Sequence, residues 1–344
     1  MNSRPLDVTV VVVGYNDRES LPTCVAALAA DPAAARIVVV DNASTDGTSE
    51  IFDSLRSLDP RVETIENPEN VGYAAAVDGV LPSITSGYLT VLNADSVPST
   101  GWLDPQVTFL DAFPQFAATS PTVTLAGTER LNATGLDIHV TGLGFNRRLH
   151  SPIDAADVKP TEVPGLQGGA FVVRRDALEA AGGWYAAGFL YHEDVELSWT
   201  LRLMGYRIAF VPTPRVDHHY SLTMSPEKLF LLERNRWETI LAHTNWTTRF
   251  AISPFLLWTE LMMWSYCALR GRSMHAAKKR SYTSIGTRRG IVSKRRSEIG
   301  RLRRVSDWRV LNAFSWNYAW DQLVFVGRRR TSAGRRGGRD MPVQ

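Results

Sequence analysis

The sequence predicts an α/β protein built on a doubly wound, mostly parallel sheet. Two apolar runs, 8–13 and 37–40, are rich in β-branched residues and end at Gly14 and Asp41, as is typical of parallel strands buried on both faces. Segments with apolar residues at helical spacing alternate with such runs as far as residue 95. This alternation predicts a sheet that binds its ligands at the carboxyl ends of its strands.

The expected elements follow one another in order. The first helix covers 20–30, with Ser20 as its N-cap and Pro22 in its first turn. A second helix is expected from Ser44 through Leu58, and a third begins at Asn70. The remaining expected elements are strands at 62–65, 88–92, 170–173 and 207–211, short strands and turns over 122–159, and helices at 193–204 and 229–242.

Length and composition limit the class of protein. A chain of 344 residues can form one large catalytic domain with an appendage, or two domains. Its two cysteines, Cys24 and Cys267, lie far apart, so neither a disulfide framework nor a zinc site is indicated and a reducing, cytoplasmic setting fits. The short polar stretch 1–7 predicts no cleavable signal peptide.

Charge is divided unevenly along the chain. Residues 1–269 hold 18 Lys and Arg against 31 Asp and Glu, whereas residues 270–344 hold 20 against 4. Just before the basic part, the apolar and Trp-rich segment 253–269 is slightly short for a bilayer span and carries Glu260 near its middle. We expect a helix in the membrane interface there, with a packed core helix as the alternative, and basic residues 278–309 facing anionic lipid.

These features predict four regions. One large domain covers 1–245, divided into halves at 8–120 and 121–245. A helical, basic, membrane-associating extension covers 246–327. The Gly- and Arg-rich residues 328–344 are expected to be disordered.

Polar residues that end the predicted strands suggest a donor site. Asp95 follows a buried strand at the edge where ligands bind, and a carboxylate there suits Mg²⁺ or Mn²⁺ held against a diphosphate. His218, after the strand 207–211, is the candidate second ligand, with a solvated loop histidine as the alternative. The donor-binding candidates are Gly14, Tyr15, Asn16, Asp41, Asn70, Gly72, Asn93 and Asp95. Several of these could instead only end strands or cap helices.

An acidic pair suggests the catalytic base. Glu193 and Asp194 stand at the start of a predicted helix, downstream of a strand preceded by Gly168 and Gly169. A carboxylate in that position can accept a proton from a sugar hydroxyl. Gly169, Trp184 and Tyr185 are the acceptor-side candidates.

In this order, the motifs resemble the inverting glycosyltransferases of family 2, which have the GT-A fold, over residues 8–245. The resemblance implies that 1–245 is a catalytic domain with a nucleotide-sugar half at 8–120 and an acceptor half at 121–245. The resemblance implies that Asp41 contacts the nucleoside, that Asp95 and His218 (six residues after Pro212) bind metal, and that Glu193-Asp194 is the catalytic pair. Within the family the chain looks most like bacterial rhamnosyltransferases of cell-surface glycan synthesis. It departs from the pattern at Asn93, where the first acid of the metal motif is missing, and at Thr200, where relatives often have arginine.

The resemblance implies a single displacement, in which Asp194 deprotonates the acceptor hydroxyl and the metal stabilises the departing diphosphate. The expected donor is dTDP-rhamnose or a UDP-sugar, and the expected acceptor is a lipid-linked or cell-envelope glycan at the cytoplasmic face of the plasma membrane. Two alternatives remain: an NDP-sugar nucleotidyltransferase, and a binding protein for anionic surfaces or nucleic acid. An apolar helix directly before the basic tail favours anionic lipid over nucleic acid.

Overall fold

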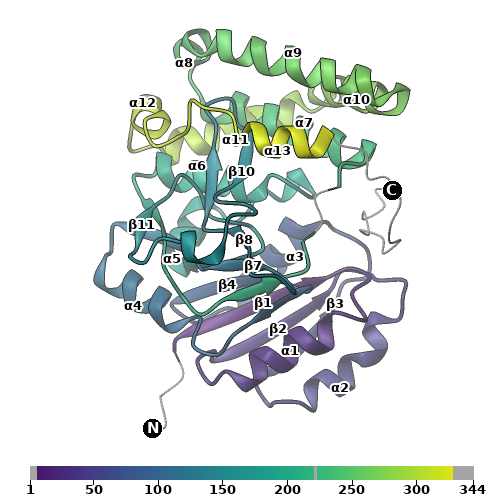
Figure 1. Cartoon of the computed structure of the whole chain (residues 1–344), viewed down its shortest axis with the longest axis vertical. Helices are drawn as coiled ribbons and strands as arrows, with labels where there is room; N and C mark the ends of the chain where they lie inside the picture. The colour runs from purple at the N-terminus through teal and green to yellow at the C-terminus, as the bar shows by residue number, and fades with distance from the viewer. Residues whose placement is uncertain (1–5, 221–222, 328–344) are drawn as a thin grey trace.

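The computed structural model describes residues 6–220 and 223–327 and has a mixed central sheet of eight strands, in the order β11-β13-β6-β12-β4-β1-β2-β3 (Figure 1). Its strands are β1 (Val8–Gly14), β2 (Arg36–Asp41), β3 (Val62–Glu66), β4 (Tyr88–Asn93), β6 (Phe116–Ser120), β11 (Thr161–Glu162), β12 (Ala170–Arg174) and β13 (Arg207–Phe210). Only β12 and β11 run against the other six. The predicted α/β class and mostly parallel direction are therefore confirmed, with β12 inserted antiparallel.

Helices cover both faces of the sheet. The helices α1 (Leu21–Ala30), α2 (Phe52–Arg56) and α4 (Asp104–Ala112) pack on one face, and α3 (Tyr73–Val80), α5 (Arg175–Ala181) and α6 (Glu193–Leu203) pack on the other. Successive side chains of β1 belong to opposite clusters, with Val10 and Val12 on one face and Val11 on the other. Burial on both faces explains why this strand is an unbroken apolar run.

The predicted helix from Ser44 to Leu58 is wrong in its first part. Helical structure begins only at Thr48, as a 3₁₀ turn (Thr48–Ile51) that leads into α2. Ser44 and Thr45 are engaged with Asn16 instead, because the Asn16 amide donates to Ser44 Oγ (2.8 Å) and the Thr45 amide donates to Asn16 Oδ1 (2.8 Å). Side chains that bond to nearby backbone in this way compete with helix formation.

The irregular region 122–159 contributes most of two small sheets. One has the order β5-β14-β7-β8, from β5 (Ser96–Pro98), β7 (Val123–Leu125), β8 (Leu131–Ala133) and β14 (Val216–His218); the other pairs β9 (Leu136–Ile138) with β10 (Gly144–Asn146). The strand β14 lies antiparallel to β5, with His218 opposite Ser96. This pairing brings His218 beside the end of β4.

The C-terminal helices stack on α6 and α7 at the end of the molecule away from α1 and α2 (Figure 1). The helix α7 covers Pro226–His243, and the C-terminal helices are α8 (Trp246–Ala251), α9 (Ser253–Arg270), α10 (Arg272–Thr287), α11 (Arg289–Leu302), α12 (Asp307–Leu311) and α13 (Trp320–Gly327). One apolar cluster joins Trp199 of α6 to Ile240, Leu256, Ile299 and Leu311. Residues 246–327 therefore share a hydrophobic core with residues 1–245.

The expected interfacial helix and the expected disordered end both lie in the C-terminal part of the chain. Within residues 6–220 and 223–327, no helix has the length and apolar character that a membrane crossing requires. The expected disordered stretch, 328–344, lies outside the described residues.

Candidate active site

Asp95 and His218 form a close pair at the carboxyl edge of the sheet. His218 Nε2 lies 3.2 Å from Asp95 Oδ1, and the His219 amide donates to the Asp95 carbonyl (3.1 Å). His218 is 5% exposed, and its Nδ1 lies 3.0 Å from Asn132 Oδ1. A proton on Nδ1, donated to that oxygen, would leave the lone pair of Nε2 available for a cation shared with Asp95.

This pair fits a divalent cation. Adjacent ligands of an octahedral ion at 2.0–2.1 Å stand about 3 Å apart, close to the separation of Nε2 and Oδ1. A buried hydrogen-bond partner such as Asn132 fixes the orientation of a ligating histidine. Within the described part of the chain, no cluster of three or more His, Cys, Asp or Glu side chains could hold a metal ion. The pair would thus leave several coordination positions for substrate oxygens.

The predicted donor residues line loops that are bonded to one another. Asp41 is 4% exposed and its Oδ1 accepts from the Ser44 amide (3.1 Å), which orders the turn after β2. Asn70 accepts from Asn42 Nδ2 (2.9 Å) and from the Gly72 amide (3.0 Å). Gly14, at the end of β1, pairs in register with Asp41.

The next two donor candidates, Tyr15 and Asn16, form the turn after β1. The Tyr15 amide donates to Asp17 Oδ2 (2.9 Å). Asn16 has a positive φ of 57°, a conformation that asparagine adopts more readily than most residues. These contacts order the loops, and a nucleotide-binding role for them stays a prediction.

Glu193 and Asp194 open α6 in a poorly solvated position. Burial raises the pKa of both carboxyl groups, and the charge of Asp194 raises the pKa of Glu193 further. Amide groups of Val195 and Gly168 bond to Asp194 and partly offset its rise. Glu193 Oε2 is buried and has no hydrogen-bond partner in the described part of the chain. Of the two, Asp194 therefore ionises more easily and is the better candidate base.

The Gly168-Gly169 turn brings the two acidic sites together. A β-carbon at Gly168 would lie 3.2 Å from Asp194 Oδ2, and one at Gly169 would lie 3.1 Å from Asn93 Nδ2. The Gly169 carbonyl also accepts from the Asn93 amide (2.9 Å). Asn93 Nδ2 is in turn 3.4 Å from His218 Nε2. Asn93, which reaches His218, and Asp194 thus both lie against this turn.

Tyr73 is a site residue that the sequence did not reveal. Its hydroxyl donates to Asn93 Oδ1 (3.3 Å), and the charges of Glu193, Asp194 and Asp95 add to burial in raising its pKa. Only the fold brings this tyrosine, at the start of α3, between both acidic groups. Asn132 was missed as well, since β8 carries no motif, although an asparagine inside an apolar strand is a signal of a buried polar contact.

The acceptor-side candidates differ in position. Trp184 is 3% exposed, and its ring lies 6.1 Å from the Phe171 ring in the core. It therefore anchors the start of the segment 185–192 in the core. Tyr185 is partly exposed and its hydroxyl donates to Glu238 Oε2 (2.9 Å). We name residues 184–192 the acceptor loop. Three of its non-glycine residues have positive φ: Phe189 (66°), Tyr191 (66°) and His192 (75°).

Known proteins resemble this chain in sequence. A model of glycosyl transferase family 2 matches residues 9–182. The pre-mycofactocin glycosyltransferase of Mycobacterium tuberculosis is 28% identical over 219 residues, which are 62% of this chain and 43% of that protein. The N-acetylglucosaminyl-diphospho-decaprenol L-rhamnosyltransferase of the same organism is 26% identical over 234 residues, 61% of this chain and 75% of that protein. The chain therefore spans less than half of the first relative.

Solved structures share the fold at low sequence identity. GalNAc-T7, crystallised with UDP, GalNAc and Mn²⁺, aligns with a TM-score of 0.57 at 19% identity over 70% of this chain and 48% of its own. The mannosyltransferase of Pyrobaculum calidifontis, in complex with GDP-Man and Mn²⁺, aligns at 0.52 and 19% over 91% of this chain and 86% of its own. The α/β fold with its mixed sheet is therefore GT-A-like.

Proposed function

The chain belongs to glycosyl transferase family 2, and on that premise we propose that it transfers a sugar from a nucleotide-diphosphate donor to an acceptor hydroxyl with inversion. One observation carries the proposal. The Asp95–His218 pair and the Glu193–Asp194 pair lie on either side of the Gly168-Gly169 turn. A diphosphate and an attacking hydroxyl have to be held in that mutual arrangement for a single displacement.

Each group then has one task. Asp194 takes the proton of the acceptor hydroxyl as its oxygen bonds to the anomeric carbon, and the bond from that carbon to the diphosphate breaks. The raised pKa of Asp194 makes it a stronger base than an ordinary carboxylate while leaving it ionisable near neutral pH. Asp95 and His218 would hold Mg²⁺ or Mn²⁺, which supplies charge stabilisation for the departing diphosphate.

The finer assignments are drawn from relatives. We expect a dTDP-rhamnose or UDP-sugar donor and a polyprenyl-linked or cell-envelope glycan acceptor; one relative transfers L-rhamnose to a decaprenol-linked sugar, which supports the rhamnose and the polyprenyl carrier. The two solved neighbours were crystallised with a nucleotide or nucleotide sugar and Mn²⁺. These similarities favour a donor site for a nucleoside diphosphate with a divalent cation.

Calorimetry with UDP-, dTDP- and GDP-sugars, with and without Mn²⁺, tests the donor site. We expect Mn²⁺ to tighten binding of one donor, and Asp95→Ala to abolish that dependence. Asp194→Asn should keep donor binding and lose about two to four orders of magnitude in turnover, because an amide cannot take the proton. Mn²⁺-dependent affinity that survives in Asp95→Ala would contradict the site, as would near wild-type turnover in Asp194→Asn.

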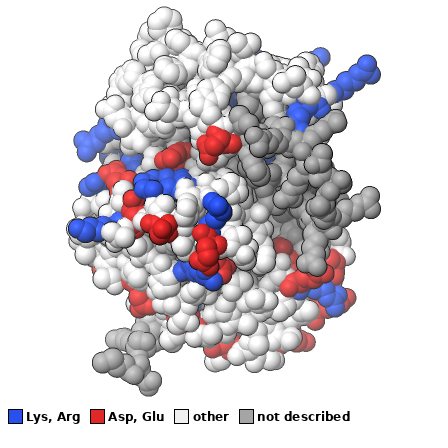
Figure 2. Space-filling model, in the orientation of Figure 1, with Lys and Arg blue, Asp and Glu red and all other residues white. Residues whose placement is uncertain are grey.

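We also propose that the protein docks on the inner face of the plasma membrane through α8 and α9. The exposed apolar side chains of these helices are Trp246, Phe250, Leu257, Trp258, Leu261 and Leu269. Within α9 the exposed positions recur at helical spacing and none is charged. Figure 2 shows that this end of the molecule is nearly free of charged side chains, with Lys and Arg beside it. An apolar face bordered by basic residues suits an anionic bilayer.

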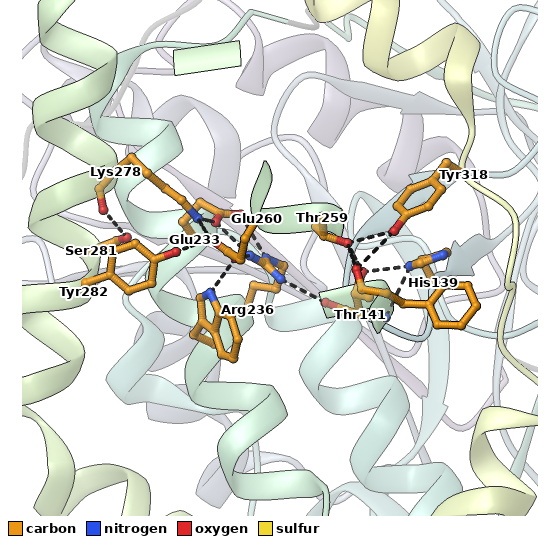
Figure 3. A network of polar contacts seen from close by, with 12 residues as sticks. His139, Thr141, Glu233, Arg236, Thr259, Glu260, Lys278, Ser281, Tyr282 and Tyr318 are labelled. Atoms are coloured by element: carbon orange, nitrogen blue, oxygen red, sulfur yellow. Dashed lines mark hydrogen bonds and ion pairs between the residues drawn. The ribbon is translucent and has the colours of Figure 1, made fainter. Parts of the chain in front are cut away.

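Glu260 does not oppose this docking, because it points into the protein. Its carboxylate bonds to Arg236 and, at 2.9 Å, to Trp237 Nε1, and Lys278 lies 2.8 Å away (Figure 3). Lys278 itself is buried, so it cannot face lipid as the sequence suggested. The exposed basic residues nearby include Arg272 and Lys279.

Sedimentation with vesicles of phosphatidylglycerol and phosphatidylcholine tests the docking. We expect the full chain to sediment at low salt and less at high salt, because screening weakens the basic contribution. Trp258→Ser with Leu261→Ser should reduce binding, whereas Trp308→Ser, at an exposed tryptophan of α12, should not. A chain that stays in the supernatant at both salt levels, or that binds duplex DNA as well as vesicles, would overturn the proposal.

A further inference from the structure

Arg288 and Arg295, which come from the C-terminal helices, contact the acceptor loop and the start of α6. Arg295 of α11 is buried, and its Nε donates to Glu196 Oε1 of α6 (2.8 Å). Its guanidinium also lies over the Tyr185 ring, 5.6 Å from the centroid. Glu196 is in the first turn of α6, two residues after Asp194. Arg295 thus contacts both the helix that presents the base and the acceptor loop.

Arg288, between α10 and α11, holds the same loop from another side. Its Nε donates to Glu238 Oε1 (2.6 Å), and its Nη2 donates to the Ala187 carbonyl (2.6 Å). Glu238 also accepts from the Tyr185 hydroxyl (2.9 Å). Arg288, Glu238 and Tyr185 therefore form a chain from the C-terminal helices to the acceptor loop.

The acceptor loop needs such support. Three of its non-glycine residues have a positive φ, which is an unfavourable backbone conformation for a residue with a β-carbon. Contacts from the surrounding structure have to hold them in it. The side-chain Nδ2 of Asn235, on α7, donates to the carbonyls of Gly188 (2.9 Å), Leu190 (3.0 Å) and Tyr191 (2.8 Å). The loop is thus bonded to α7 along its length and to Arg288 at Ala187.

Each arginine is the partner of a buried carboxylate: Arg295 pairs with Glu196, and Arg288 pairs with Glu238. Burial alone would raise the pKa of Glu196, yet Arg295 and His243 lower it to about 2. Glu238 is 1% exposed and pairs with Arg288. A buried carboxylate that loses its partner carries an uncompensated charge, so removing either arginine would disturb the element that it contacts.

We propose that Arg288 and Arg295 are positioning residues for the transfer reaction, holding the acceptor loop and the start of α6 in place from the C-terminal helices. This rests on the proposed function for its consequence, but not for its geometry. Arg295 Nη2 also lies 3.5 Å from Thr200 Oγ1, a second contact between α11 and α6.

Hydrogen–deuterium exchange of the full chain tests the geometry. Arg288→Ala should speed exchange of amides 185–192, and Arg295→Ala those of 193–200, by about ten- to a hundredfold, the equivalent of a lost charged hydrogen bond. Arg301→Ala, on the exposed face of α11, should change neither. If an alanine variant does not fold, Arg288→Lys or Arg295→Lys replaces it, with a smaller increase expected because the charge remains.

Kinetics separates positioning from general stability. With the donor that calorimetry identifies, kcat should fall in both alanine variants while KM for the donor stays unchanged, and lysine should restore part of kcat. Unchanged exchange in both segments, or equal acceleration across the whole chain, would overturn the proposal. If wild-type protein binds no UDP-, dTDP- or GDP-sugar with Mn²⁺, the proposed function fails, whereas the exchange result still decides whether the arginines hold these segments.

Discussion

Glu193 carries the least favourable charge in the candidate site. Its Oε2 is buried without a partner among the described residues, and burial together with the charge of Asp194 raises its pKa. The neutral acid is therefore the form that the fold accommodates. Since an unfolded glutamate ionises near pH 4.3, the fold loses stability as the pH rises above that value and toward the folded-state pKa.

Glu193→Gln should therefore stabilise the protein in a pH-dependent way. We expect no gain near pH 4, where glutamate is protonated in both states, and a gain of about 1–3 kcal/mol near pH 8. Urea denaturation at both pH values measures it. Glu179→Gln, at an exposed residue of α5, is the control and should stay within about 0.5 kcal/mol. A gain in the free energy of unfolding that does not change with pH would show that ionised Glu193 does not destabilise the fold.

At the scale of elements, the start of α3 depends on one glycine. Gly72 has φ of 85°, and a β-carbon there would lie 2.4 Å from the Phe189 carbonyl oxygen of the acceptor loop. The next amide, of Tyr73, donates to that same oxygen (2.8 Å). Close approach and a left-handed backbone both require glycine at this position.

Gly72→Ala is expected to destabilise the protein by about 1–3 kcal/mol and to displace the acceptor loop. Gly79→Ala, in the same helix, has open space for a β-carbon and should instead stabilise by about 0.5–1 kcal/mol. Thermal unfolding of the two variants compares them directly. Equal effects at both positions would contradict the close packing of α3 on the loop.

The helices α7, α9 and α10 meet at a buried ion network (Figure 3). Glu233 and Arg236 of α7 pair at 2.8 Å, Glu260 of α9 pairs with Arg236, and Lys278 of α10 pairs with both acids. Two positive and two negative groups balance. The net charge of the network is zero only when all four side chains are present, so removing one leaves a buried charge without a partner.

Lys278→Met should destabilise the fold by about 3–5 kcal/mol, since it removes the charge and keeps most of the volume. Arg215→Met is the matched control, because its pair with Glu129 (3.1 Å) is exposed and should contribute below about 1 kcal/mol. Denaturant titration of both variants gives the difference. A loss at Lys278 no larger than at Arg215 would mean that the network is hydrated rather than buried.

At the scale of the whole molecule, the C-terminal helices pack on residues 1–245 through a shared apolar cluster and buried ion pairs. Truncation after Asn245 would remove Lys278, Arg288 and Arg295 and would uncover part of the apolar cluster around Trp199. We expect the shortened chain to lose cooperative unfolding in calorimetry rather than to give a folded catalytic domain. A sharp transition near that of the full chain would show that residues 1–245 fold alone.

Much of this arrangement could be predicted from the sequence. The β-branched runs before Gly14 and Asp41 determined buried parallel strands, because a strand covered on both faces has to be apolar throughout. The acids at strand and helix ends marked the site, since the carboxyl edge of such a sheet is where polar groups reach a ligand. The family follows from the order of these motifs.

Only the tertiary structure decided which residues share the site and what the C-terminal helices do. Tyr73 follows the candidate Gly72 without being marked itself, whereas Asn132 and Arg295 come from segments without a motif. Pairing between distant elements sets the positions of all three. Composition predicted that the basic part of the chain would face outward. Lys278 and Arg295 turn inward because each meets a buried carboxylate there, and long-range contacts of this kind leave no local pattern in the sequence.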